Sequence, residues 1–249
     1  MRSLIAAEYL KLRTTRSAPV TLAVVVLLSA VMPLAYATAA GSGDIPTLTP
    51  DSLPDMLLTP ARLIGAAVLL LGVLAAAAEY GHRTIVTARL QEPRATRLLT
   101  AKLVSLALLG LVVGVTAEVV ALAASAVTLT QHHATVHVAT PGVGKVLVLV
   151  PLAVALQGAL GVAIGALLRN TAAAVGVTLV WALVVEGVLP VVLRRPELSG
   201  WLPAGAINEV TASRNTSGAL GAGAAALLVL AYATALVAGT VTLDRRREL

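Results

Sequence analysis

Two acidic residues stand out because each lies inside a long apolar run of the sequence. Glu118 lies within residues 103–129 and Glu186 within residues 171–192, among mostly Ala, Val, Leu and Gly. A carboxylate in hydrocarbon is costly and usually faces the interior of a helix bundle or a water-filled path. Contact with a substrate and binding of a proton are the chemistries that suit such a group. For Glu186, an ion pair with Arg194, eight residues further along, is an equally good structural interpretation.

The densest charge lies between two apolar runs, in residues 79–102, EYGHRTIVTARLQEPRATRLLTAK. This segment holds five Lys or Arg residues, two Glu residues and one His. Such a segment marks a membrane surface, and its excess of basic residues is typical of the cytoplasmic side. We expect it to form a loop through which the protein contacts a partner.

Other chemistries are disfavoured by what the sequence lacks. There is no cysteine, which excludes thiolate metal ligands and disulfides. The three histidines at 132, 133 and 137 have no further ligand residues nearby, which favours a polar loop over a metal site. The segment PGVGKV at 141–146 lacks the first glycine and the Ser or Thr of a phosphate-binding loop. We therefore predict no catalytic residue, metal or cofactor in this chain.

Composition predicts the fold class. The 249 residues are 58% hydrophobic and only 12% charged, which is too little polar surface for a soluble domain. We predict one all-α, polytopic membrane domain over residues 1–249, in a bacterial plasma membrane. The net charge of +6 is expected to face anionic lipid and not nucleic acid. The excess of Arg over Lys indicates a GC-rich genome, such as that of an actinobacterium.

Hydropathy predicts six membrane spans with both termini in the cytoplasm. The expected spans are 18–39, 62–78, 103–129, 146–168, 171–192 and 218–243. In this topology 13 of the 18 Lys and Arg residues lie inside and 5 outside. External segments are expected at 40–61, 130–145 and 193–217, and a tight cytoplasmic turn at Arg169 and Asn170.

Residues 1–16 predict an interfacial amphipathic helix before the first span. Glu8 interrupts its apolar side slightly. A plain basic leader is the alternative, whereas a cleaved signal peptide is disfavoured because the apolar run that follows is too long. The residues that define this helix are Ile5, Tyr9 and Leu12 on the apolar side, with Lys11 and Arg13 at its flanks.

Two local patterns bear on how the spans pack. The glycine pairs Gly110/Gly114 and Gly161/Gly165 allow helices to approach closely, without indicating which helices. Pro190, close behind Glu186, predicts a break in the fifth helix.

These segments together resemble the permease subunits of ABC-2 type (type-2 exporter class) ATP-binding-cassette transporters. AEYLKLRTTRS at 7–17 resembles their amphipathic N-terminal helix. EYGHRT at 79–84 and QEPRATRLLTAK at 91–102 resemble their cytoplasmic loop after the second span. The segment PELSGWLPAGAINEV at 196–210 resembles their partly helical segment between spans five and six.

The resemblance implies an exporter half in which two permeases, identical or related, pair with two ATPase subunits that bind ATP and Mg. The loop after span two would act as a coupling helix in a groove of the ATPase, with the N-terminal helix beside it. The residues implied for coupling are Glu79, Tyr80, Arg83, Arg89, Glu92, Arg94 and Arg97. Those implied for a translocation path at the permease interface are Glu118, Trp181 and Glu186. Residues 193–217 would partly re-enter the membrane, and the exported substrate would be a lipid, glycan, drug or peptide.

Two other functions stay open. A secondary carrier coupled to ions or protons would use Glu118 and Glu186, although no inverted repeat is apparent between the two halves. A membrane assembly subunit without transport activity is the third reading of the same six spans.

Overall fold

The computed structural model describes residues 2–14, 17–42, 47–81, 90, 94–132, 135–136, 138, 141–211 and 221–247. Within these residues six helical segments are long and apolar enough to cross a membrane, and no strand occurs. The prediction of an all-α polytopic membrane protein is confirmed. The helices that carry the six spans are α2 (Ser17–Ala39), α3 (Leu53–Gly81), α5 (Ala95–Gln131), α6 (Pro141–Leu168), α7 (Thr171–Val180) with its continuation, and α10 (Ala222–Arg247).

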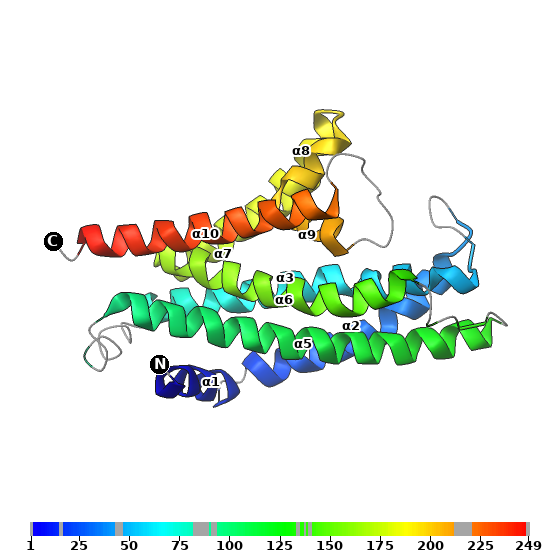
Figure 1. The fold of residues 1–249 in the computed structure, drawn as a ribbon, viewed down its shortest axis with the longest axis horizontal. Coiled ribbons are helices and arrows are strands. Elements are labelled where there is room, and N and C mark those ends of the chain that lie inside the picture. The colour runs from blue at the N-terminus through cyan, green and yellow to red at the C-terminus, as the bar shows by residue number, and fades with distance from the viewer. Residues whose placement is uncertain are drawn as a thin grey trace.

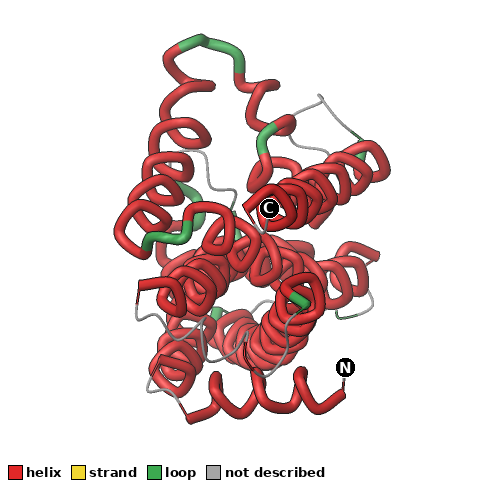
Figure 2. The backbone as a smooth tube through the Cα atoms, turned by 90° about the vertical axis from the view of Figure 1, so that its left-hand side faces the viewer, coloured by secondary structure: helices red, strands yellow, loops and turns green. Residues whose placement is uncertain are grey.

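Helices α2, α3, α5 and α6 form the main bundle, and α1 (Arg2–Thr14) lies across one end of it (Figures 1 and 2). Its core is built from aliphatic side chains of these four spans. Val25, Ile64, Val113 and Val146 are among the buried members of one cluster. Both termini lie toward the same end of the molecule (Figure 1).

The two predicted glycine pairs serve different contacts of α6. A Cβ atom on Gly161 or Gly165 would collide with the backbone of α3 near Val73. A Cβ atom on Gly110 or Gly114 of α5 would be within 2.9 Å of backbone atoms of α6. Because only glycine permits these approaches, α6 packs closely against both neighbours and forms the centre of the bundle.

The fifth span is not broken at Pro190 as expected, but widened before it. The chain forms a π-helix, η2 (Trp181–Val188), and then continues as the short helix α8 (Leu189–Val192). The Leu189 N–H bonds to the carbonyl of Val184, five residues back. Proline has no N–H to offer, and the wider turn accommodates this gap without ending the helix.

The fifth span packs against α3 through its α7 part, diverges from the main bundle toward α8 (Figure 1), and exposes much of its apolar surface. Leu183 is 67% exposed and Val191 is 74% exposed. After α8 the chain forms the 3₁₀ helix η3 (Pro196–Trp201) and the helix α9 (Pro203–Thr211), which packs against α10 and α6. The Tyr232 hydroxyl donates to the Trp201 carbonyl over 2.8 Å and joins α10 to η3.

Helix α3 begins at Leu53, so part of the segment expected as an external loop is helical. A short 3₁₀ helix, η1 (Pro50–Ser52), leads into it, and a capping box joins Thr49 to Ser52. Asp51 and Asp55 lie in the first turns, where negative charge is favourable at a helix N-terminus. These local signals start the helix ahead of the apolar run.

The expected loop 79–102 is also shorter than predicted. Helix α3 continues to Gly81 and α5 begins at Ala95, so both ends of the charged segment are helical. Residues 82–89 and 91–93 lie outside the described part of the chain, as do two of the three histidines, at 133 and 137.

Candidate functional site

Four charged side chains meet where α1, α3 and α5 converge at one end of the bundle. We call Glu8, Lys11, Glu79 and Lys102 the charge cluster, and the end that holds it the cluster end. The Lys102 ammonium donates to Glu8 Oε2 over 2.6 Å and to Glu79 Oε1 over 2.8 Å. The Lys11 ammonium donates to Glu8 Oε1 over 2.7 Å and to Glu79 Oε1 over 3.2 Å. Each cation therefore bridges both carboxylates, and the cluster has no net charge.

The cluster is largely removed from solvent. The side chains of Lys102 and Glu8 are only 7% and 5% exposed, while Lys11 covers them from outside. Burying charges is expensive unless they are paired and hydrogen-bonded, as they are here. Removing one partner would leave a buried charge without compensation.

Protonation equilibria reflect this pairing. Burial of the Glu8 carboxyl opposes its ionisation, but the charge and hydrogen bond of Lys102, together with Lys11, outweigh burial and lower the pKa of Glu8. Burial likewise opposes the charged form of Lys11, but the hydrogen bond to Glu8 and the charge of Glu79 raise the pKa of Lys11. Both groups are therefore charged throughout the physiological pH range.

The cluster attaches the N-terminal helix to both spans that flank residues 82–94. A second contact supports it, because the Ser105 hydroxyl lies 3.3 Å from the Ile5 carbonyl oxygen. The interpretation of Glu8 as an interruption of an apolar side was wrong. Glu8 is 4% exposed and holds α1 in place, whereas Tyr9 is 46% exposed. The reason is that the inward face of α1 packs on the buried ammonium of α5 and not on lipid.

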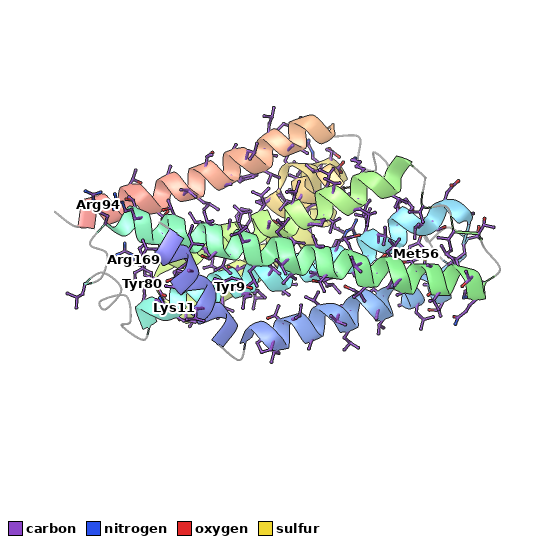
Figure 3. All side chains as sticks on the ribbon, turned by 60° about the horizontal axis from the view of Figure 1, so that its bottom comes forward. Tyr9, Lys11, Met56, Tyr80, Arg94 and Arg169 are labelled. Carbon is purple, nitrogen blue, oxygen red and sulfur yellow. The ribbon has the colours of Figure 1, made fainter. Side chains whose placement is uncertain are left out.

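The remaining residues predicted for coupling are found at the same end where they are described. Figure 3 shows Lys11, Tyr80, Arg94 and Arg169 gathered there, with Met56 toward the opposite end. The Arg169 guanidinium lies 5.2 Å from the centre of the Tyr80 ring, a cation–π contact that ties the predicted turn after α6 to the end of α3.

Arg94 and Arg97 begin α5 and are exposed. The other predicted coupling residues, Arg83, Arg89 and Glu92, lie outside the described residues, as do the side chains of Leu12 and Arg13. Two exposed arginines therefore lie at the start of the helix that carries Lys102.

Glu186 has a structural role that neither sequence-based alternative foresaw. It accepts hydrogen bonds from the Trp181 indole N–H over 2.8 Å and from the Ala204 backbone N–H over 3.0 Å. Ala204 lies in the first turn of α9, where backbone N–H groups lack partners within the helix. Glu186 thus caps α9 and fixes it to the π-helix, instead of pairing with Arg194.

Glu118 does not join Trp181 and Glu186 in one hydrogen-bonded site. It is 3% exposed within α5, and its Oε2 atom has no hydrogen-bond partner among the described residues. The three residues predicted for a path therefore divide into a bonded pair on the fifth span and a separate buried acid in the main bundle.

Sequence reasoning missed two members of the charge cluster, Glu8 and Lys102, as functional candidates. The available signal was helical spacing, since Glu8 and Lys11 lie three residues apart and share a face of α1. No group of metal-binding side chains occurs among the described residues. Comparison with known proteins adds no identity, because no family model and no curated protein matches this chain.

Proposed function

We propose that this chain is the membrane-spanning permease subunit of an ATP-driven transporter of the ABC-2 type, acting as an exporter driven by a separate ATPase subunit. The observation that carries the proposal is the charge cluster. It ties an N-terminal helix to the two spans on either side of residues 82–94, the segment expected to dock on the ATPase. The cluster end would then be cytoplasmic.

The proposed mechanism follows from the rigid junction of α1, α3 and α5. A partner that displaces the segment between α3 and α5 also displaces α1, because three ion pairs between described residues join these helices. Because α6 packs closely against α3 and α5 at the glycines, a movement of those two helices also moves α6. ATP binding and hydrolysis in the partner would thus shift the bundle between two packings without an intramembrane catalytic group.

A second permease copy, identical or related, is part of the proposal. The fifth span exposes apolar side chains on most of its surface, with only Ala174, Thr178 and Pro190 buried along Thr171–Val192. An apolar span with so few contacts within its own chain suits packing against a partner span. The substrate would pass along that interface, near Trp181 and Glu186.

The test is capture of the ATPase. We would express the chain with candidate ATPase subunits from the same genome, and compare R94E/R97E with R194E/R195E as the matched control. Both double variants reverse two exposed arginines, one pair at the start of α5 and the other shortly after α8. We expect R94E/R97E to lose the co-purified ATPase and the stimulated ATP hydrolysis, and the control to keep both. Equal retention or equal loss in the two variants would contradict the proposal.

A proton-coupled carrier is the second candidate, and Glu118 favours it. This acid is buried in the bundle with an oxygen that lacks a partner among the described residues. The carrier would transport without any ATPase, and a pH gradient across proteoliposomes would drive uptake that E118Q abolishes.

A further inference from the structure

A small cavity lies about midway along α6. It is enclosed by α3, α6 and α9 and has a volume of ≈ 30 Å³. Apolar side chains such as Val154 and Ile207 form part of its wall. Four polar side chains complete it: Arg62, Gln157, Asn208 and Thr211. Arg62 and Gln157 lie on membrane-spanning helices, where polar side chains are uncommon.

Gln157 presents an incomplete hydrogen-bonding group at this cavity. It is 9% exposed, and its Oε1 atom is buried without a hydrogen-bond partner among the described residues. A buried carbonyl oxygen without a partner is destabilising, so such atoms are nearly always satisfied by protein, water or ligand. The carboxamide lies directly against Gly65, where a Cβ atom would overlap it. The α3 backbone therefore leaves room for this side chain.

Arg62 supplies a positive charge beside it. Its side chain is exposed, and it makes no ion pair or hydrogen bond with any residue that the structure describes. Arg62 lies 17 residues from Glu79 along α3, or about 25 Å at the rise of an α-helix. With the charge cluster at one membrane surface, this distance places Arg62 close to the opposite surface of a hydrocarbon core of about 30 Å.

Helix α9 forms the third side of the cavity, and the hydrogen bond between Glu186 and Ala204 holds this helix in place. The helix brings Asn208 and Thr211 to the cavity. The Thr211 hydroxyl donates to the Ile207 carbonyl over 3.0 Å, which leaves its oxygen as an acceptor. Cation, amide donors and acceptors are thus held in place by three separate helices.

We propose that this cavity binds the headgroup of a membrane lipid that carries a phosphodiester and a hydroxyl group. The phosphate would lie at the mouth, where a guanidinium can donate two parallel hydrogen bonds to its oxygens. The hydroxyl end would enter the cavity, and rotation of the Gln157 carboxamide away from Gly65 would bring Oε1 within reach of that hydroxyl. A volume of ≈ 30 Å³ holds two or so groups of the size of water, which fits a hydroxymethyl end but not a whole headgroup.

Other headgroups fit less well. A choline headgroup has no donor for Gln157 and is larger than the cavity. An ethanolamine headgroup has a donor, but its ammonium would lie beside the charge of Arg62. In the proposed orientation of the protein, the site faces the outer leaflet. The inference does not depend on the proposed transport function, because it uses only contacts within this chain.

The experiment compares lipid retention without any ATPase. Protein purified in dodecyl maltoside would be mixed with equal amounts of phosphatidylglycerol and phosphatidylcholine, and the retained lipids counted by native mass spectrometry. We expect the wild type to retain phosphatidylglycerol preferentially. R62Q should lower its affinity about tenfold, and Q157L should do the same by removing the acceptor. R194Q, which removes an exposed arginine away from the cavity, should retain the preference.

Several results would overturn the proposal. Equal retention of the two lipids by the wild type would do so, as would an unchanged preference in R62Q, whose exposed side chain can be replaced without disturbing the fold. Loss of the preference in R194Q would indicate general charge attraction in place of a site. Glycerol 3-phosphate tests the source of the headgroup. If it raises the melting temperature of the wild type but phosphatidylglycerol is not retained, a soluble phosphate ester is the ligand and not a lipid.

Discussion

The charge cluster and the interior of the bundle both bury polar side chains, but they differ in how far those side chains pair with one another. At the cluster end, two carboxylates and the Lys102 ammonium are largely buried, the half-exposed Lys11 covers them, and each cation bridges both anions. Further along the helices, Glu118 Oε2, Gln157 Oε1 and the hydroxyls of Ser29 and Ser125 are buried without hydrogen-bond partners among the described residues. The first arrangement resists change because each of its charges has an opposite charge within hydrogen-bonding distance. The second marks positions where a proton, water or ligand is still needed.

Lys102→Met should give the largest effect, because it removes the buried cation that bridges Glu8 and Glu79. We expect a loss of about 3–5 kcal/mol in the stability of this junction, seen as a lower melting temperature and faster proteolysis of α1. Replacing Glu8 by Leu in the same protein should restore part of the loss, because the remaining Lys11–Glu79 pair is balanced. Additive losses in the double variant would show that the cluster is not a coupled unit.

Acid should loosen α1 selectively. The pKa of Glu8 is lowered in the folded protein, so its stabilising contribution is complete above the unfolded value of about 4.3 and is lost as pH falls through the folded value. The raised pKa of Lys11 has the opposite sense, and its contribution is lost only in strong alkali. The protection of α1 amides, expressed relative to the intrinsic exchange rate at each pH, should therefore be independent of pH near neutrality and fall below about pH 4. E8Q should remove this acid response, and a response that persists in E8Q would exclude Glu8 as its source.

Glu186→Gln should have a smaller effect, because glutamine still accepts a hydrogen bond but loses its charge at the N-terminus of α9. We expect a loss of about 1 kcal/mol, measured by thermal unfolding monitored through tryptophan fluorescence. Adding R194Q should not restore stability, since the described hydrogen bonds of Glu186 go to Trp181 and Ala204. Rescue by R194Q would favour the ion pair that the sequence had suggested.

Glu118→Gln should have the smallest effect on stability. It keeps the shape of a side chain that forms no described hydrogen bond through Oε2, so the melting temperature should shift by the equivalent of less than about 1 kcal/mol. ATP-driven transport with the partner ATPase should also persist. If transport instead stops while the melting temperature is unchanged, Glu118 is a working proton or substrate site and the bundle interior is functional after all.

The spans were predictable because hydrophobic length alone determines them. The apolar runs ending at 39, 168 and 192 match the ends of α2, α6 and α8 closely. The glycine pairs predicted close packing but not its partners, since spacing along one helix carries no information about the neighbouring helix. The start of α3 was missed because its signals, the capping box and the acidic first turns, lie in a polar segment outside the apolar run.

The site was harder to predict because its contacts join distant parts of the chain. Glu8 and Lys102 are 94 residues apart in the sequence and 2.6 Å apart in the structure. Periodicity placed Glu8 on the inner side of its helix, and there it looked like a defect in an apolar surface. Only the position of α5 shows that a buried cation lies opposite. Glu186 was recognised as unusual for the right reason, but its partner is a backbone N–H group, which every residue except proline carries.

The 37-residue helix α5 has one more consequence, which is mechanical. At 1.5 Å per residue it is about 55 Å long, nearly twice the thickness of the hydrocarbon it crosses. A stiff rod of this length turns small angles into large displacements, since a tilt of about 5° moves one tip by roughly 5 Å relative to the other. Lys102 lies near one tip and His132 caps the other. An antibody fragment bound at His132 should therefore slow movements that begin at the opposite membrane surface.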